Sequence, residues 1–522
     1  FAPGATHAPH HVPKEWADKY KGKFDAGWDK LREETFARQK KLGVIPADAQ
    51  LTARPDEVPS WDSMPEEFKP ALRREMEVYA GFLEFADHHV GRLLETIEKL
   101  GAMDNTLIYY IIGDNGASAE GGLNGCFNEM SYFNGLQGLE TAEYLTERLD
   151  KLGGPESYNH FAVGWAHAMN TPLQWTKQVA SHWGGTRNGT IVHWPKGIKA
   201  KGEQRTQFAH VIDVAPTILE AAGIPEPVSV DGITQDPIDG VSMLHTFNDA
   251  AAPEHHETQY FEVMGNRAIY HKGWTAVTKH YTPWIQGARI PLDDDVWELY
   301  NTTTDWSQAR DLAKEMPDKL REMQRLFIIE ATRFKVLPLD DRMFEKINPD
   351  TAGRPVLIKG KQQLLAGGMT HLSENCVLNV KNKSHSVTAE IVVPEGGARG
   401  VIIAQGADIG GWVLYAHEGK LKYCYNWGGF KHFMAQGATV LSPGDHQVRM
   451  EFAYDGGGLG KGGKATLYVD GKKDGECVVG ATLAMIFSAD DGLDVGKDGG
   501  SAVSPDYPSG DNAFNGKVKG VL

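Results

Sequence analysis

The sequence is poor in the features that mark disulfide scaffolds, membrane spans and nucleic-acid binders. Its four cysteines are too few and too scattered for a disulfide framework or a paired-cysteine metal site. No run of 18 apolar residues occurs, so no membrane-spanning helix is expected. The 53 Lys and Arg residues are outnumbered by 69 Asp and Glu, which gives a formal net charge of −16. This argues against nucleic acid as a partner, because phosphate binding requires clustered basic residues.

What is present is ordinary globular composition, with 41% hydrophobic and 23% charged residues. At about 100–200 residues per domain, the length predicts two to four domains. The chain begins at Phe1, with no basic or apolar leader, directly in the histidine-rich segment Thr6–His11. We therefore expect that residues upstream of Phe1 are missing.

Residues 1–255 alternate helical, loop and strand patterns, which predicts an α/β domain. A helix is expected near 27–42. The apolar spacing from Met76 to Ile97 predicts a long amphipathic helix, which Gly101 would end. Leu107–Ile112 is a continuous apolar run, typical of a strand that is buried on both faces of a parallel sheet.

The rest of the chain divides by pattern. Residues 256–345 are expected to form a small antiparallel sheet and a helix near 317–333, and residues 346–365 a linker. Short strands of alternating polarity over 366–522 predict a lectin-like β-sandwich or jelly roll. Residues 117–172 are a Gly-, Asn- and aromatic-rich insertion, for which a lid or a substrate rim is a hypothesis.

A candidate metal site follows the predicted strand at Leu107–Ile112. Asp114 and Asn115 stand between two glycines, and in doubly wound proteins ligands bind beyond the carboxyl ends of strands. Their oxygens suit a hard cation such as Ca²⁺ or Mg²⁺. An Asp-Asn-Gly sequence alone is more often a plain turn. Its position after a buried strand favours the metal-ligand interpretation.

Several segments in this order resemble the sulfatases of the alkaline phosphatase superfamily, in particular the large bacterial arylsulfatases. The resemblance covers roughly residues 1–345 and implies an alkaline-phosphatase-like parallel sheet flanked by helices, incomplete in this chain. The segments are APHH at 8–11, GDNG at 113–116, TPLQWTKQVASHWGGTRNGTIVHWPKGI at 171–198, AHVIDVAPTILEAAGI at 209–224, GNRAIYHKGW at 265–274 and WELYN at 297–301.

The resemblance implies that Asp114 and Asn115 bind one Ca²⁺, that Lys177 contacts the sulfate oxygens, and that His10 faces the bridging oxygen of the ester. The implied nucleophile is a hydrated formylglycine made from a C/S-x-P-x-R motif, which this sequence does not contain. The lysine and histidine that follow the motif and the first aspartates are absent too. We therefore expect the formylglycine in the missing N-terminal part. We also expect this chain alone to be inactive and poorly soluble.

The function this implies is an arylsulfatase-like hydrolase that cleaves a small aryl or alkyl sulfate ester, or a sulfated carbohydrate. One alternative is a phosphonate or phosphate ester hydrolase of the same superfamily, although the lone Asp-Asn pair favours one calcium over two zinc ions. Another is a carbohydrate-binding role of residues 366–522. Its aromatic residues are equally expected in a sandwich core: Trp412, Tyr415, Tyr423, Tyr425, Trp427 and Phe430.

Simpler interpretations remain for each residue. Lys177 alone would be a solvated surface charge. The histidines at 7, 10 and 11 would be loop residues or zinc ligands. His182 is either an active-site contact or a packed residue, and His210 and Asp213 suit helix capping. The oligomeric state is unknown, as is the compartment, with the bacterial cytoplasm or periplasm expected for a soluble protein.

Overall fold

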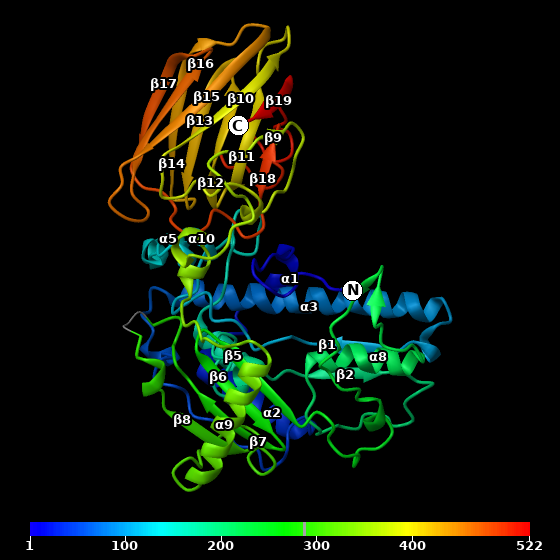
Figure 1. Cartoon of the computed structure of the whole chain (residues 1–522). Coiled ribbons are helices and arrows are strands. Elements are labelled where there is room, and N and C mark those ends of the chain that lie inside the picture. Colours follow the sequence, from blue (N-terminus) through cyan, green and yellow to red (C-terminus); the bar gives the residue numbers. More distant parts are fainter. Residues whose placement is uncertain (286–288) are drawn as a thin grey trace. The chain divides into compact units, whose positions relative to one another are not determined.

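The computed structural model describes residues 1–285 and 289–522, which form two compact units (Figure 1). Unit 1 consists of Phe1–His7, Val12–Gly125 and Phe161–Asp341. Unit 2 consists of Ala8–His11, Cys126–His160 and Arg342–Leu522. Most of the insertion at 117–172 therefore belongs to the unit that contains the C-terminal strands. No helix within the described ranges has both the length and the apolarity to cross a bilayer.

Unit 1 is a mixed α/β structure. Its helices are α1 (Lys14–Asp18), α2 (Gly27–Leu42), α3 (Lys69–Lys99), α6 (Val163–Met169), α7 (Trp183–Thr186), α8 (Val214–Ala222) and α9 (Pro317–Arg333). Its strands are β1 (Ile108–Ile111), β2 (Thr190–His193), β3 (Ser229–Val230), β4 (Ile233–Thr234), β5 (Thr258–Val263), β6 (Asn266–His271), β7 (Trp274–Thr278) and β8 (Trp297–Asn301). The mixed α/β class predicted for this part of the chain is confirmed.

Helix α3 is present where the apolar spacing predicts it. Of the residues in that pattern, Met76 is 6% exposed, but Leu83 is 45% exposed, so the spacing predicts the helix better than its buried face. Gly101 has a φ of +68° just beyond the helix end, a conformation that glycine adopts without a Cβ penalty. Gly81 lies where α1 crosses α3, and a Cβ there would lie 2.6 Å from the backbone nitrogen of Ala17. The close crossing of the two helices thus depends on glycine.

Strands β1 and β2 pair with each other in the antiparallel direction. The strand predicted over Leu107–Ile112 is therefore present, but the parallel direction expected for it is wrong for this pair. The strand is not buried on both faces either: Ile111, Ile112 and Ile191 are 38%, 59% and 56% exposed. A continuous apolar run is typical of parallel sheets, but the direction of the neighbouring strand is set by contacts with a distant segment, here residues 190–193.

The small antiparallel sheet predicted for residues 256–345 is confirmed. Its strands lie in the order β5-β6-β7-β8, each antiparallel to the next. Helix α9 covers the sheet with the same bounds, 317–333, that its sequence pattern predicts. Ile269 and Leu299 of the sheet pack with Phe327 of α9, and all three are at most 1% exposed.

Unit 2 is built around two antiparallel sheets. Its strands are β9 (Leu365–Ala366), β10 (His385–Val393), β11 (Gly400–Ala407), β12 (Gly410–His417), β13 (Lys420–Trp427), β14 (Lys431–Val440), β15 (Gly444–Tyr454), β16 (Gly463–Val469), β17 (Lys472–Val479), β18 (Leu493–Val495) and β19 (Lys517–Val521). Its helices are α4 (Glu129–Phe133), α5 (Ala142–Thr146) and α10 (Pro349–Ala352). The sheet orders are β17-β16-β15-β10-β19-β9 and β14-β13-β12-β11-β18.

The core of unit 2 lies between these sheets, as the predicted β-sandwich requires. Ile391 and Val448 of one sheet pack in a single cluster with Leu414 and Tyr423 of the other. Segment Cys126–His160 is fastened to the sandwich by asparagines. Asn128 Nδ2, for example, donates to the carbonyl oxygens of Ile409 at 3.0 Å and Gly428 at 3.1 Å.

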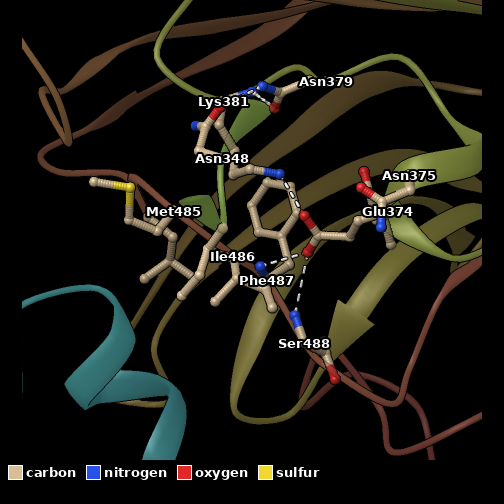
Figure 2. Close-up of polar contacts among 12 residues, drawn as sticks. Asn348, Glu374, Asn375, Asn379, Lys381, Met485, Ile486, Phe487 and Ser488 are labelled. Atoms are coloured by element: carbon tan, nitrogen blue, oxygen red, sulfur yellow. Dashed lines mark hydrogen bonds and ion pairs between the residues drawn. The ribbon is translucent and has the colours of Figure 1, made fainter. Parts of the chain in front are cut away.

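A buried ion pair fixes the segment before β10 to the sandwich (Figure 2). The Lys381 side chain is 3% exposed and pairs with Glu374. The other Glu374 oxygen accepts from the backbone N–H groups of Phe487 at 2.5 Å and Ser488 at 3.3 Å. The Lys381 ammonium also lies 4.8 Å from the centre of the Phe487 ring. Both charges are therefore compensated by local contacts.

Candidate functional site

The turn after β1 carries the two predicted metal ligands at the surface. Asn115 Nδ2 donates to Asp114 Oδ1 at 2.5 Å, and Asp114 is exposed. The N–H of Gly116 donates to the carbonyl oxygen of Gly185 at 2.9 Å. A Cβ at Gly116 would lie 1.7 Å from the carbonyl oxygen of Gly184. Glycine at this position thus lets the turn pack against α7.

Lys177 lies on a tightly packed loop between α6 and α7. Its neighbours Thr176 and Gln178 are 0% and 3% exposed, whereas the Lys177 side chain is 23% exposed. Trp175, two residues earlier, has a φ of +67°, which is unusual outside glycine. Lys177 is therefore not a freely solvated surface charge: it reaches the surface from a buried and constrained backbone.

Asn170 joins the loop of Lys177 to the loop of Asn115. Its Oδ1 accepts from the N–H of Ala117 at 2.9 Å, and its Nδ2 donates to the carbonyl oxygen of Trp175 at 3.0 Å. In addition, the N–H of Lys177 donates to the carbonyl oxygen of Ala117 at 3.1 Å. The two loops that carry predicted site residues are thus held side by side in unit 1.

The ammonium group of Lys177 has two side-chain partners that the sequence interpretation did not assign to the site. Its Nζ lies 3.2 Å from Glu120 Oε2 and 3.3 Å from His7 Nε2. A protonated lysine can only donate, so His7 Nε2 accepts at this contact. His7 stands in the histidine-rich segment that the sequence points to, but nothing in the sequence marks Glu120.

His10 belongs to unit 2, whereas His7, Lys177, Asp114 and Asn115 belong to unit 1. His10 is 1% exposed, and its N–H donates to the carbonyl oxygen of Asn159 at 3.3 Å. The structure thus brings Lys177 together with His7, and the role of His10 stays a prediction.

His182 is a packed residue. It is 0% exposed, its Nδ1 lies 3.0 Å from Ser181 Oγ, and its Nε2 lies 3.4 Å from Glu298 Oε2. The capping role of His210 and Asp213 is confirmed, because the N–H of His210 donates to Asp213 Oδ2 at 2.7 Å.

The donor set for a metal ion is incomplete. Within residues 1–285 and 289–522, no group of three or more His, Cys, Asp or Glu side chains is placed to hold a metal. The zinc interpretation of the N-terminal histidines therefore gains no support. Asp114 and Asn115 offer the oxygen donors that calcium prefers, but calcium takes about 6–8 oxygens. The two side chains therefore supply the right kind of donor for calcium but too few donors to hold it alone.

Four of the six aromatic residues proposed as a sugar platform are buried, three in the cluster between the sheets (Trp412, Tyr423 and Tyr425) and Tyr415 in a separate cluster. Their exposed fractions are 2% for Trp412, 1% for Tyr415, 1% for Tyr423 and 4% for Tyr425. Trp427 and Phe430 are half-buried, with ring centres 6.1 Å apart. The sandwich-core interpretation is confirmed for Trp412, Tyr423 and Tyr425.

Two family models match overlapping parts of the chain. The Sulfatase model matches residues 1–224, and the model for the N-sulphoglucosamine sulphohydrolase C-terminal region matches residues 182–326. Together they span unit 1 almost completely. The chain belongs to the sulfatase family.

Curated relatives agree with this placement. This sulfatase-family chain is 31% identical to an uncharacterized sulfatase of Schizosaccharomyces pombe, over 66% of the chain and 59% of the relative. It is 28% identical to an arylsulfatase of Klebsiella aerogenes, over 50% of the chain and 52% of the relative. It is 21% identical to an N-acetylglucosamine-6-O-sulfatase of Bacteroides thetaiotaomicron, over 56% and 39%. The chain thus spans less than two thirds of each relative.

Proposed function

We propose that this chain contributes the Lys177 side of the active site in a hydrolase of aryl or alkyl sulfate esters. The observation that carries the proposal is the joining of two loops in a sulfatase-family chain. Lys177, fixed on a buried loop, is hydrogen-bonded through its backbone to Ala117, two residues after Asn115. A cationic side chain and a pair of oxygen donors thus share one small region of unit 1.

Lys177 would stabilise charge on the sulfate group. Hydrolysis of a sulfate monoester places negative charge on the non-bridging oxygens and on the leaving oxygen in the transition state. A fixed ammonium aimed at those oxygens lowers the barrier because it needs no reorganisation as the charge develops. The buried neighbours of Lys177, Thr176 and Gln178, limit its backbone movement.

A histidine would transfer the proton to the leaving oxygen, since imidazole gains and loses a proton near neutral pH. His7 is the candidate favoured by geometry, with its Nε2 3.3 Å from Lys177 Nζ. His10 is the candidate implied by the family resemblance. Separate His7→Asn and His10→Asn variants distinguish them: the proton donor is the one whose loss slows alkyl sulfates more than activated aryl sulfates.

The proposal includes one calcium ion and a formylglycine nucleophile. Asp114 and Asn115 would supply two of the oxygens that hold the ion, with further ligands from elsewhere. When bound, calcium would stabilise negative charge on the sulfate oxygens. The C/S-x-P-x-R motif from which formylglycine is made does not occur among the 522 residues.

The test compares ester classes in the full-length protein. Turnover is measured on an aryl sulfate and on the corresponding aryl phosphate, and bound metal is determined by elemental analysis. The proposal predicts preference for the sulfate and about one calcium per chain. Preference for the phosphate with two zinc ions would contradict it and favour the phosphate or phosphonate ester alternative.

A further inference from the structure

Glu120 is fixed in front of Lys177 by its own contacts. Ser118 Oγ donates to Glu120 Oε2 at 2.8 Å, and Gln178 Nε2 lies 3.5 Å from Glu120 Oε1. The Glu120 side chain is 14% exposed. Gln178 directly follows Lys177, so the loop that carries the lysine also binds its carboxylate partner. Glu120 therefore connects the loop after Asn115 with the loop of Lys177 through two contacts, one to Lys177 and one to Gln178.

The ammonium of Lys177 keeps one donor for a ligand. It has three N–H groups, and Glu120 and His7 are its only side-chain partners in the described part of the chain. A lysine side chain has a flexible stem of four carbons, so an unpaired ammonium group would sample many positions. Two fixed partners restrict this sampling and define the direction of the third N–H.

We propose that Glu120 is a positioning residue, which holds Lys177 so that its third N–H meets an oxygen of the sulfate group. This inference rests on the proposed function of Lys177. The negative charge of Glu120 also acts against sulfate binding, because a carboxylate near an anion site repels the anion. Positioning and repulsion therefore predict opposite effects when the Glu120 charge is removed, and the sign of the effect decides between them.

The experiment uses the 522-residue chain and inorganic sulfate as the probe. The rate of reductive methylation of each lysine is followed by mass spectrometry at increasing sulfate concentration, and the half-protecting concentration for Lys177 is determined. Glu120→Gln, which keeps the size of the side chain, should raise that concentration at least threefold. Glu120→Asp, which keeps the charge, should give an intermediate value.

The matched control is Glu57→Gln. Glu57 pairs with Lys279 in the same unit, with side chains 30% and 26% exposed, against 14% and 23% for Glu120 and Lys177. This variant should change the methylation rate of Lys279 without sulfate and leave sulfate protection of Lys177 as in the unchanged chain. An unaltered Lys279 rate in Glu120→Gln shows that unit 1 is folded. If Glu120→Gln fails to fold, Glu120→Asp decides alone. Positioning then requires its half-protecting sulfate concentration to be higher than that of the unchanged chain.

Two results would overturn the inference. An equal or lower half-protecting concentration in Glu120→Gln would show that Glu120 only repels the anion or has no influence on it. Absence of sulfate protection in the unchanged chain would overturn the sulfate role of Lys177 and the positioning role with it. In that case the sulfate-free methylation rates still show whether Glu120 holds Lys177, so the failure of the proposed function is recognised separately.

Discussion

At the scale of single residues, the candidate site is defined by contacts between loops that lie far apart in the sequence. Lys177 meets Glu120, 57 residues earlier, and His7, 170 residues earlier. Spacing along the chain cannot reveal such pairs, which is why Glu120 and Asn170 were not predicted. Asp114 and Asn115 were predicted from their position after a strand and from the family resemblance, and Lys177 from the resemblance.

Asp114 should be essential for metal retention if it is a calcium ligand. In the full-length protein, Asp114→Ala removes a charged oxygen donor, so calcium affinity should fall by at least about tenfold, with a parallel loss of turnover. Isothermal titration calorimetry measures the affinity. Asp104→Ala, which removes another exposed carboxylate of unit 1, is the control. Equal calcium affinity in the Asp114 and Asp104 variants would refute the assignment.

At the scale of elements, the buried pair of Glu374 and Lys381 holds a loop on the sandwich. Lys381→Met leaves the Glu374 carboxylate, whose side chain is only 15% exposed, without its cation. It should lower the free energy of unfolding by about 3–5 kcal/mol. Adding Glu374→Gln should recover part of this loss, because the amide oxygen can still accept from Phe487 and Ser488. Urea unfolding measures both effects.

The matched control for that pair is Lys383→Met. Lys383 pairs with Asp350 at 2.6 Å, with side chains 45% and 50% exposed. An exposed pair contributes about 0–1 kcal/mol, so this variant should be nearly as stable as the unchanged chain. Equal losses in Lys381→Met and Lys383→Met would show that burial does not strengthen the Glu374 pair.

A second buried pair predicts how the stability of unit 1 depends on pH. His256 Nδ1 lies 2.8 Å from Asp213 Oδ1. Burial lowers the pKa of His256, but the hydrogen bond and charge of Asp213 outweigh it and raise the pKa above its usual value. Burial raises the pKa of Asp213, but its hydrogen bonds, first that from His256, bring the pKa below its usual value.

The stabilisation from His256 is therefore complete below about pH 6.5 and is lost as the pH rises through the raised pKa. That from Asp213 is present above about pH 3.9 and is lost as the pH falls. Urea unfolding followed by tryptophan fluorescence should show stability falling as the pH rises above about 6.5, and His256→Gln should reduce this loss. The same loss in His256→Gln would assign the pH dependence to other groups.

At the scale of the whole molecule, the sequence predicts the classes of structure better than their pairing. The bounds of α9 and the alternating strands of the sandwich follow from local periodicity, which is a property of each segment alone. The antiparallel pairing of β1 with β2, and the inclusion of Cys126–His160 in unit 2, depend on contacts between distant segments. The same holds for the candidate site: Lys177 lies in a segment that the sequence marks, whereas Glu120 is brought to it only by packing.

The exposed isoleucines on and beside β1 and β2 predict self-association of the chain. Ile112 and Ile191 are 59% and 56% exposed. Apolar patches of this kind promote association in water. We expect concentration-dependent oligomers by light scattering, and fewer of them in the double variant Ile112→Thr and Ile191→Thr. A monodisperse monomer of the unchanged chain at high concentration would contradict this expectation.

The most direct test of the proposed site is the activity of Lys177→Ala in the full-length protein. If Lys177 stabilises charge on the sulfate group, kcat/KM for an aryl sulfate should fall by a factor that corresponds to about 2.7–4 kcal/mol, roughly 10²–10³-fold. Lys177→Arg should restore it only in part, because a planar guanidinium differs from a point charge. Lys19→Ala removes another unit 1 lysine with a carboxylate at 3.2 Å and should have no such effect. A loss below about threefold for Lys177→Ala would contradict the account.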